Sequence, residues 1–482
     1  TGPAEPAAGH RDPHRTVIAL LLVSAFVVIL NETIMGVALP RLMEDLRITA
    51  VAGQWLTTAF MLTMAVVIPV TGFLLQRFPT RPVFLAAMTL FSLGTLVCAA
   101  APGFATLLVG RVVQACGTAI MMPLLMTTVL TLVPPDRRGR VMGNISVVIS
   151  VAPAIGPTIS GLVLSVLPWR WMFILVLPIA VGSLLLGAWR IRNVTEPRPA
   201  PLDVASVVLS ALGFGGLVYG LSTFGEGSSA AVPAWVPLAV GAVALGAFVL
   251  RQTRLQRADR ALLDLRTFRS RVFTTSTLVL GVSMMALFGT LIVLPIYLQT
   301  VHGLDPLATG LLLLPGGLVM GLLAPVVGRV YDRAGPAVLL VPGSVLVSAA
   351  LWGLAVTSGD TPVPLVLAAH VVLSTGLALM FTPLFTAGLG ALPQRLYSHG
   401  SAVVGTVQQV AGAAGTALFV TVMTLGTAAA AASGAAGAAA TAAGVQDAFR
   451  CGAAISLLAV AGACFVRRPE TVVGAGAPVS AH

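Results

Sequence analysis

The chain has 482 residues, of which 57% are hydrophobic and only 9% are charged, and its mean hydropathy is +0.98. Soluble globular domains carry roughly 25% charged residues, so this composition excludes an ordinary soluble protein. The net charge of +11 comes from 27 basic residues, all arginines. They are spread over many short segments as an orientation signal, so a nucleic-acid partner is not expected.

Apolar stretches recur along the whole chain, and each is close to the roughly 20 residues that a helix needs to cross a bilayer. They lie near residues 16–38, 52–74, 82–100, 105–126, 140–164, 172–190, 203–222, 234–251, 272–298, 307–330, 337–357, 362–386, 401–424 and 449–466. The sequence therefore predicts an all-α membrane protein with 14 transmembrane helices.

The arginines collect in every second gap between these stretches. If residue 1 lies in the cytoplasm, 22 of the 27 arginines fall in cytoplasmic segments, 4 fall outside, and Arg111 lies within a span. The positive-inside rule then predicts a multi-pass protein of the cytoplasmic (inner) membrane with both termini in the cytoplasm.

A weak internal repeat divides the chain. "GFLLQRFPTRP" at 72–82 follows the second span, and "GRVYDRAGP" at 328–336 follows the tenth. If these turns are equivalent, the chain consists of two six-helix halves with two helices inserted between them, a plan typical of secondary transporters. The expected segments are a disordered cytoplasmic tail (1–15), an N-terminal bundle (16–190), two inserted helices (203–251), a cytoplasmic amphipathic linker (252–271), a C-terminal bundle (272–466) and a second cytoplasmic tail (467–482).

Two longer connections have their own compositions. Arginines alternate with apolar residues in the linker, which indicates an amphipathic helix lying on the inner membrane surface. Residues 427–444 are nearly all Ala, Gly, Ser and Thr, and they fit either a loose outer loop or a continuation of the preceding helix.

Three ionisable residues lie inside predicted spans, where charges are costly and usually functional: Glu32, Arg111 and His370. Glu32 and Arg111 lie at similar depth, so they can offset each other's desolvation if their helices are neighbours. Glu32 is the expected proton site, and the alternative is a structural ion pair. Asn31 precedes Glu32 and points about 100° away around the helix, so only one of them faces a cavity squarely. For His370, proton coupling competes with a simple hydrogen bond to a neighbouring helix.

Glycine and proline are concentrated in the fifth span. "VAPAIGPTISG" places Pro153, Gly156, Pro157 and Gly161 within three turns. Proline kinks a helix and glycine permits close helix packing, so this segment is expected to bend and slide against a partner. The alternative is that Gly and Pro are simply common in membrane helices.

Several motifs together resemble those of the fourteen-helix drug:proton antiporters of the major facilitator superfamily, from about residue 16 to 466. The similar segments are "LNETIMGVALP" (30–40), "GFLLQRFPTRP" (72–82), "GRVVQACGTA" (110–119), "APAIGPTISG" (152–161), "WRWMF" (169–173), "YLQ" (297–299) and "HGSAVVGTVQQVAGAAGTA" (399–417).

The resemblance implies the major facilitator fold, with two six-helix bundles that rock around a central cavity. It also implies proton uptake, a role of Arg111 in proton transfer, and a role of Gly156 and Pro157 in closing the cavity. The family usually has Asp at the positions of Asn31 and Gln76, and in this chain the first-helix acid appears one position later, as Glu32.

Residues of the two loop motifs are expected to control the conformation: Gly72, Gln76, Arg77, Arg81, Asp332 and Arg333. Asp332 and Arg333 are expected to supply the contact that Gln76 weakens. The alternative for Arg77 and Arg81 is that they are orientation charges only. Asn31, Gln114, Met35 and Met284 are expected to line the substrate cavity, where flexible methionines suit varied ligands.

The resulting hypothesis is proton-coupled efflux of amphipathic drugs or antibiotics by alternating access. The alternatives are an uptake symporter for a small metabolite and a lipid-moving protein without proton coupling. No enzyme activity is expected, and without a nucleotide-binding loop the proton gradient is the expected energy source, with no cofactor and no metal. The expected partners are the bilayer, protons and a small amphipathic substrate, and the chain is expected to be a monomer.

Overall fold

The computed structural model describes residues 13–48, 50–194, 202–223, 232–435 and 437–466. The C-terminal tail predicted for 467–482 and most of the N-terminal tail predicted for 1–15 lie outside these ranges. Within them the structure contains α and 3-10 helices and no strand.

Fourteen helices in the described ranges are long and apolar enough to span a bilayer, as the sequence predicts. The first six are α1 (Pro13–Leu46), α2 (Ala50–Arg77), α3 (Thr80–Ala99), α4 (Phe104–Leu132), α5 (Arg138–Val166) and α6 (Trp171–Arg190). The next two are α7 (Val204–Thr223) and α8 (Trp235–Leu255). The last six are α9 (Arg271–Thr300), α10 (Pro306–Ala334), α11 (Ala337–Leu354), α12 (Val363–Gly390), α13 (Tyr397–Ala432) and α14 (Gly437–Ala463).

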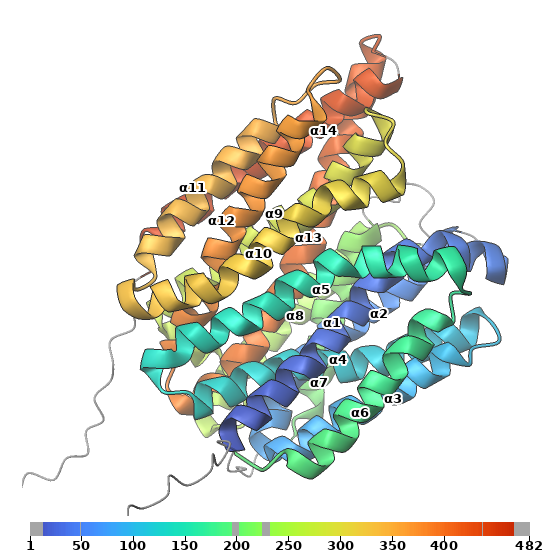
Figure 1. Cartoon of the computed structure of the whole chain (residues 1–482). Coiled ribbons are helices and arrows are strands. Elements are labelled where there is room, and N and C mark those ends of the chain that lie inside the picture. Colours follow the sequence, from blue (N-terminus) through green and yellow to red (C-terminus); the bar gives the residue numbers. More distant parts are fainter. Residues whose placement is uncertain (1–12, 49, 195–201, 224–231, 436, 467–482) are drawn as a thin grey trace, which may run out of the picture.

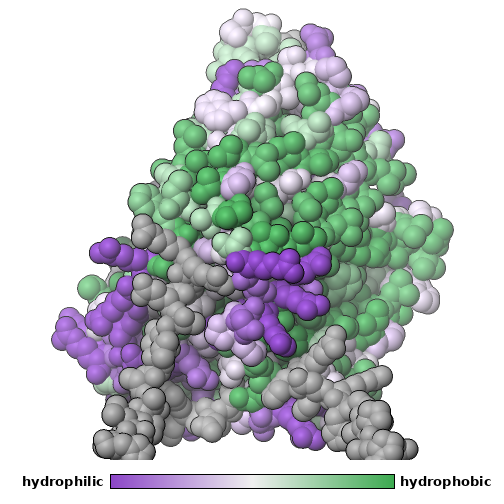
Figure 2. All heavy atoms as spheres, turned by 60° about the vertical axis from the view of Figure 1, so that its left-hand side comes forward, coloured by the Kyte–Doolittle hydropathy of each residue, from purple (hydrophilic) through white to green (hydrophobic). Residues whose placement is uncertain are grey.

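Large apolar side chains cover the outside of the bundle. Leu162, Leu185, Val243, Leu322 and Leu458 are each at least 64% exposed. Figure 2 shows the hydrophobic residues as a broad band, with hydrophilic side chains gathered mainly below it, toward one end. Burying such a surface in lipid removes it from water, so the exposed apolar band is the face expected for a membrane protein.

The first six and last six helices pack in the same pattern. In the first half α1 packs against α5 and α6, and α4 against α2 and α3; in the second half α9 packs against α13 and α14, and α12 against α10 and α11. The two bundles of the predicted fold are therefore both present, and α2 and α10, which carry the two loop motifs, occupy equivalent places.

The inserted helices α7 and α8 pack against each other, and α7 also contacts α2 and α13. Arg251 on α8 forms two hydrogen bonds, of 2.6 and 2.7 Å, with the carboxylate of Asp203 at the start of α7. The Arg251 guanidinium holds the pKa of Asp203 well below its usual range. This ion pair therefore stays charged at neutral pH and joins the two inserted helices.

The linker after α8 is not a surface helix, and that interpretation of its amphipathic pattern is wrong. It contains two short 3-10 helices, Gln256–Ala258 and Leu265–Arg269. Leu262 and Leu263 are buried at 2% and 3% exposure. The backbone N–H of Leu263 donates to Oε1 of Gln252 on α8, at 3.2 Å. Leu262 and Leu263 thus face protein rather than lipid, whereas Phe268 is 41% exposed.

Several helices extend beyond their predicted spans, most of all α1, α13 and α14. α14 begins at Gly437, before the predicted limit at residue 449. α1 begins at Pro13 and ends at Leu46, so its last two turns lie past the predicted limit at residue 38. α13 continues to Ala432, so the first part of the segment 427–444 continues the preceding helix and is not a loose loop. Hydropathy sets the length of the apolar span, whereas a helix can continue into the interface without apolar residues.

The seam between the halves runs along α5 and α10, which lie side by side in Figure 1. The two carboxylate oxygens of Asp332, near the end of α10, accept hydrogen bonds of 2.8 Å from the backbone N–H groups of Gly139 and Arg140. These N–H groups belong to the first turn of α5, where a helix lacks internal acceptors and favours negative charge. A Cβ atom at Gly139 would overlap Asp332 and the backbone of Gly328, so glycine permits this approach.

A second seam joins α2 to α13. The side-chain nitrogen of Gln76 lies 3.3 Å from the carbonyl oxygen of Arg395 and 2.8 Å from Nε2 of His399. Gln76 is the fifth residue of the first loop motif, and Gly72 of the same motif lies against His399. Arg77 and Arg333 are exposed. Gln76 therefore helps to hold the two halves together although it lacks a charge.

Further polar contacts between the halves lie nearby. Thr127 donates to Ser401 at 3.2 Å, and Thr382 donates to Ser146 at 2.7 Å. Within the described ranges, the hydrogen bonds that join the halves lie between the middle of the helices and one end. α2, α4, α10 and α12 finish at this end, and α5 and α13 begin there. We call it the arginine-rich end, and the structure is closed there.

Replacing Asp332 with Asn should loosen this closure. Asparagine keeps one acceptor oxygen but loses the charge that favours the N-terminus of α5. Hydrogen bonds to charged groups contribute about 1.5–3 kcal/mol, so closure should weaken by at least about fivefold. The measurement is the rate at which a hydrophilic maleimide alkylates Ser401→Cys, a site only 3% exposed beneath the closure, after replacement of the native cysteines.

The matched control is Asp136→Asn, because Asp136 lies at the same end in an exposed pair with Arg137, at 3.6 Å. The control should leave the alkylation rate unchanged. Equal rates in the parent and in Asp332→Asn would contradict the role of this carboxylate.

Candidate functional site

Arg111 on α4 is buried at 1% exposure and is held by groups from three helices. Its Nη1 donates to Oε1 of Gln114 at 2.6 Å and to Oδ1 of Asn31 on α1 at 3.3 Å. Nε donates to the carbonyl oxygen of Leu56 on α2 at 3.5 Å, and the guanidinium lies 4.0 Å from the centre of the Phe60 ring. The expected proximity of the first and fourth spans is thus present.

Gln114 links Arg111 to Thr95 on α3. Its Nε2 donates to Oγ1 of Thr95 at 2.8 Å, and Thr95 donates to the carbonyl oxygen of Phe91 at 2.7 Å. Because the hydroxyl of Thr95 accepts a hydrogen bond from the amide nitrogen of Gln114, the amide oxygen of Gln114 points toward Arg111. Thr95 and Phe60 were not predicted, since a hydroxyl or a ring within an apolar span is too common to indicate a site.

Glu32 lies beside this network but not in it. The side chain is half-buried on α1, and its charge interacts with that of Arg111. Nevertheless, the described residues contain no Glu32–Arg111 ion pair within 4.0 Å, because Asn31 occupies the position that faces the guanidinium. Consecutive helical residues point about 100° apart, so the two side chains cannot both face Arg111 directly.

The fifth-helix motif packs against the turn that carries Glu32. Oγ1 of Thr33 donates to the carbonyl oxygen of Leu30 at 2.9 Å and contacts that of Ala152 on α5 at 3.4 Å. A Cβ atom at Gly156 would overlap Thr33 Oγ1, whereas one at Gly161 would meet no atom within 4 Å. Gly156 therefore lets α5 approach α1 next to the carboxyl group.

The remaining residues of this motif are placed less specifically. α5 is helical without interruption through Pro153 and Pro157, and the side chain of Pro157 lies outside the described part of the structure. Pro153 is half-buried. The predicted bending of this segment stays a prediction.

The remaining predicted residues are His370 and the four residues expected to line the substrate cavity. Nε2 of His370 on α12 lies 3.2 Å from the carbonyl oxygen of Leu313 on α10, which is a contact within the second half. Met35 and Met284 are buried at 2% and 3% exposure, and Asn31 and Gln114 are occupied with Arg111. In this closed structure these four residues are packed in the core, and their contact with substrate stays a prediction.

Arg81 joins α3 to α6 within the first half. Its Nη2 donates to the carbonyl oxygen of Ala188 at 2.6 Å, and its backbone N–H donates to Oδ1 of Asn193 at 3.1 Å. These contacts do not cross the seam between the halves, so Arg81 differs in this respect from Gln76 and Asp332.

Comparison with known proteins agrees with this architecture. A family model described as Major Facilitator Superfamily matches residues 21–416. The chain is 38% identical over 411 residues to the lincomycin resistance protein LmrB of Listeria monocytogenes, covering 85% of this chain and 87% of that protein. It is 29% identical over 430 residues to a multidrug resistance protein B homolog of Mycobacterium tuberculosis, covering 86% and 78%.

Solved structures share the fold at low sequence identity. The crystal structure of the human organic anion transporter MFSD10 superposes with a TM-score of 0.70 at 16% identity, covering 94% of this chain and all of that one. The proton:xylose symporter XylE superposes with a TM-score of 0.62 at 13% identity, covering 94% and 96%. The family model, the resistance proteins and the shared fold all agree with the motifs, and the chain belongs to the major facilitator superfamily of membrane transporters.

Proposed function

We propose that this chain exports amphipathic drugs or antibiotics across the cytoplasmic membrane in exchange for protons. The names of the lincomycin and multidrug resistance relatives support this substrate class. The observation that carries the proposal is the pairing of a buried guanidinium with neutral amides, while the carboxyl of Glu32 lies within its electrostatic range.

This arrangement suits proton exchange because the Glu32 carboxyl is not locked in an ion pair with Arg111. Arg111 keeps its hydrogen bonds to Asn31 and Gln114 whether Glu32 is protonated or ionised. An ionised carboxylate within the membrane is costly, so it favours either a proton or a cationic group of the substrate. Competition between these two partners for one carboxyl would couple their opposite movements.

The closure supports alternating access. If the arginine-rich end faces the cytoplasm, as the positive-inside rule predicts, the structure corresponds to the state closed toward the cytoplasm. The proton would then reach Glu32 from outside and leave it inside after the halves rock. The proton gradient supplies the energy, and a monomer contains every element of this cycle.

Replacing Glu32 with Gln should uncouple transport from the pH gradient. For each proton exchanged with a monocationic substrate, one pH unit supports at most about a tenfold concentration ratio. In proteoliposomes the parent should approach this ratio for at least one compound of a panel of dyes and antibiotics that includes lincomycin. Glu32→Gln should bind the same compound but give a ratio of about one.

The matched control is Glu44→Gln on the same helix, because Glu44 lies at the exposed end of α1 in a surface pair with Arg41, at 3.3 Å. It should transport like the parent. Full gradient-driven accumulation by Glu32→Gln would refute the proton role, and inward accumulation by the parent would favour an uptake symporter. Movement of lipid without any pH dependence would favour the third hypothesis.

Replacing Gly156 with Ala should slow transport by disturbing the α1–α5 contact beside Glu32. The added methyl group overlaps Thr33 Oγ1, and overpacking of this kind costs about 1–3 kcal/mol. Gly161→Ala in the same motif adds a methyl group in open space and should keep the parental rate. The initial rate of dye efflux at equal protein levels measures both, and equal slowing in the two variants would contradict a specific contact at Gly156.

A further inference from the structure

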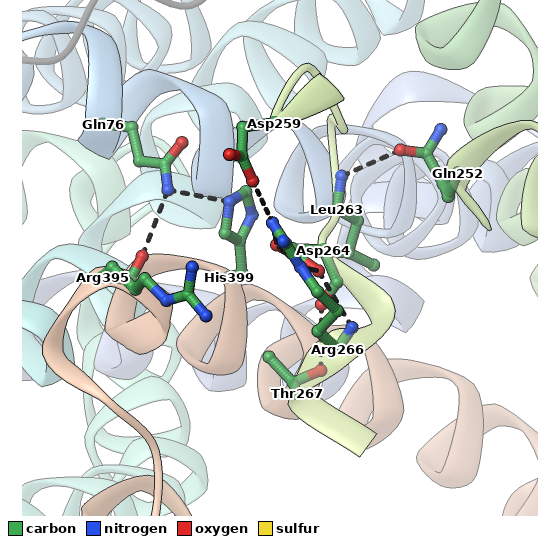
Figure 3. Close-up of polar contacts among 9 residues, drawn as sticks. All are labelled: Gln76, Gln252, Asp259, Leu263, Asp264, Arg266, Thr267, Arg395 and His399. Atoms are coloured by element: carbon green, nitrogen blue, oxygen red, sulfur yellow. Dashed lines mark hydrogen bonds and ion pairs between the residues drawn. The ribbon is translucent and has the colours of Figure 1, made fainter. Parts of the chain in front are cut away.

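His399 is a buried titratable residue that the proposed proton pathway does not use. It lies in the first turn of α13 with 4% exposure, at the meeting point of α2, α13 and the linker. Figure 3 shows Gln76 and Arg395 on one side of its ring and the Arg266 ion pairs of the linker on the other. The ring therefore lies where the two halves and their connection touch.

The hydrogen bonds at this junction require a neutral imidazole. The Arg395 carbonyl oxygen can only accept, so the Gln76 atom that lies 3.3 Å from it is the amide nitrogen. The same nitrogen lies 2.8 Å from Nε2 of His399, so Nε2 must offer a lone pair and the ring proton is on Nδ1. A proton on Nε2 would place two donors against each other.

The surrounding charges offer no ready partner for an imidazolium. From the linker, Asp259 and Asp264 both bind the guanidinium of Arg266, which holds the pKa of Asp259 below its usual value. The other charged side chains nearby are the cations Arg77, at the end of α2, and Arg395, in the 3-10 turn before α13. Within the described residues Nδ1 has no hydrogen-bond partner, and the ring faces the backbone of Leu262.

We propose that His399 is a proton-binding site that controls the closure at the arginine-rich end. A proton at Nε2 removes the acceptor that Gln76 uses. To restore a hydrogen bond, the amide must turn its oxygen toward His399, and it then loses the bond to the Arg395 carbonyl. Either result removes one of the two hydrogen bonds that join α2 to the start of α13. Acidification therefore weakens the closure and favours the open form, and a more alkaline pH favours the closed form.

The direction in which pH shifts the equilibrium between the open and closed forms follows from the linkage between proton binding and conformation. The closed form needs unprotonated His399, so closure releases a proton and lower pH favours the open form. In the open form, where water reaches the ring, an imidazole titrates at its ordinary pKa of about 6.5, so the pH change acts within the range in which cells operate. One such site changes the open-to-closed ratio by at most about tenfold per pH unit. The inference rests only on the alternating-access part of the proposed function and requires no substrate.

The test measures the distance between spin labels at Phe78→Cys in the first half and Val338→Cys in the second by double electron–electron resonance. Both positions are exposed near the arginine-rich end, at 44% and 57%. The four native cysteines are replaced, and the protein is in lipid nanodiscs at pH 8.0 and pH 5.5. The parent should shift to longer distances at pH 5.5, and His399→Gln, which cannot be protonated, should lose this shift.

Four further variants keep the result interpretable. His302→Gln and His370→Gln should keep the shift, because these histidines lie away from the closure. Gln76→Glu should reverse its sign, because a carboxylate favours the imidazolium, so this variant tests the proposal even if His399→Gln does not fold. Glu32→Gln should keep the shift, which separates this site from the proposed transport chemistry.

A parent without any pH-dependent shift would overturn the proposal. A shift that persists in His399→Gln would also overturn it, as would one that disappears in Glu32→Gln instead. Loss of the shift in His399→Gln together with its reversal in Gln76→Glu would support His399 even if the transport assay rejected proton-coupled export.

Discussion

A guanidinium buried in the first six-helix bundle is the constraint around which the candidate site is built. Arg111 cannot lose its charge cheaply, so it needs acceptors, and α1, α2 and α4 supply them from Asn31, Leu56 and Gln114. The neutral amides of Asn31 and Gln114 accept hydrogen bonds from the guanidinium without neutralising its charge. The field of Arg111 therefore remains available to act on Glu32, the adjacent carboxyl.

In the proposed function, this arrangement lets Glu32 serve as the proton site although the first-helix motif has Asn31 in place of an acid. An aspartate at position 31 would face Arg111 directly and form a strong, fixed ion pair. With Asn31 in that place, the acid is moved about 100° around the helix to position 32, next to Thr33 and the close contact with Gly156. A carboxyl that is attracted by the guanidinium but not held by it can exchange its proton for another partner.

The closure at the arginine-rich end uses two different chemistries at equivalent places. On α10 the charged carboxylate of Asp332 binds the N-terminus of α5, whereas on α2 the neutral amide of Gln76 binds Arg395 and His399. The first contact joins a carboxylate to backbone N–H groups and contains no imidazole. The second depends on the state of an imidazole. If both contacts must break before the halves rock, the proposed protonation of His399 makes the closure at the arginine-rich end sensitive to pH.

Much of the fold could be predicted because hydropathy and arginine placement report directly on the bilayer. The proximity of Arg111 to the first helix was also predictable, since two costly groups at the same depth favour each other. The partner of Gln76 was not predictable, because a glutamine in a turn does not indicate which of many carbonyls or rings it meets. The amphipathic pattern of the linker was misleading, since buried protein and lipid select the same apolar residues, Leu262 and Leu263.

The most direct measurement for the central claim is infrared difference spectroscopy of the carboxyl stretch in lipid-embedded protein, with and without a transported compound, across the neutral pH range. The account predicts a band from a protonated carboxyl that diminishes when the compound binds and that is absent from Glu32→Gln but present in Glu44→Gln. A spectrum without such a band, or one that is unchanged in Glu32→Gln, would contradict the claim that this carboxyl carries the exchanged proton.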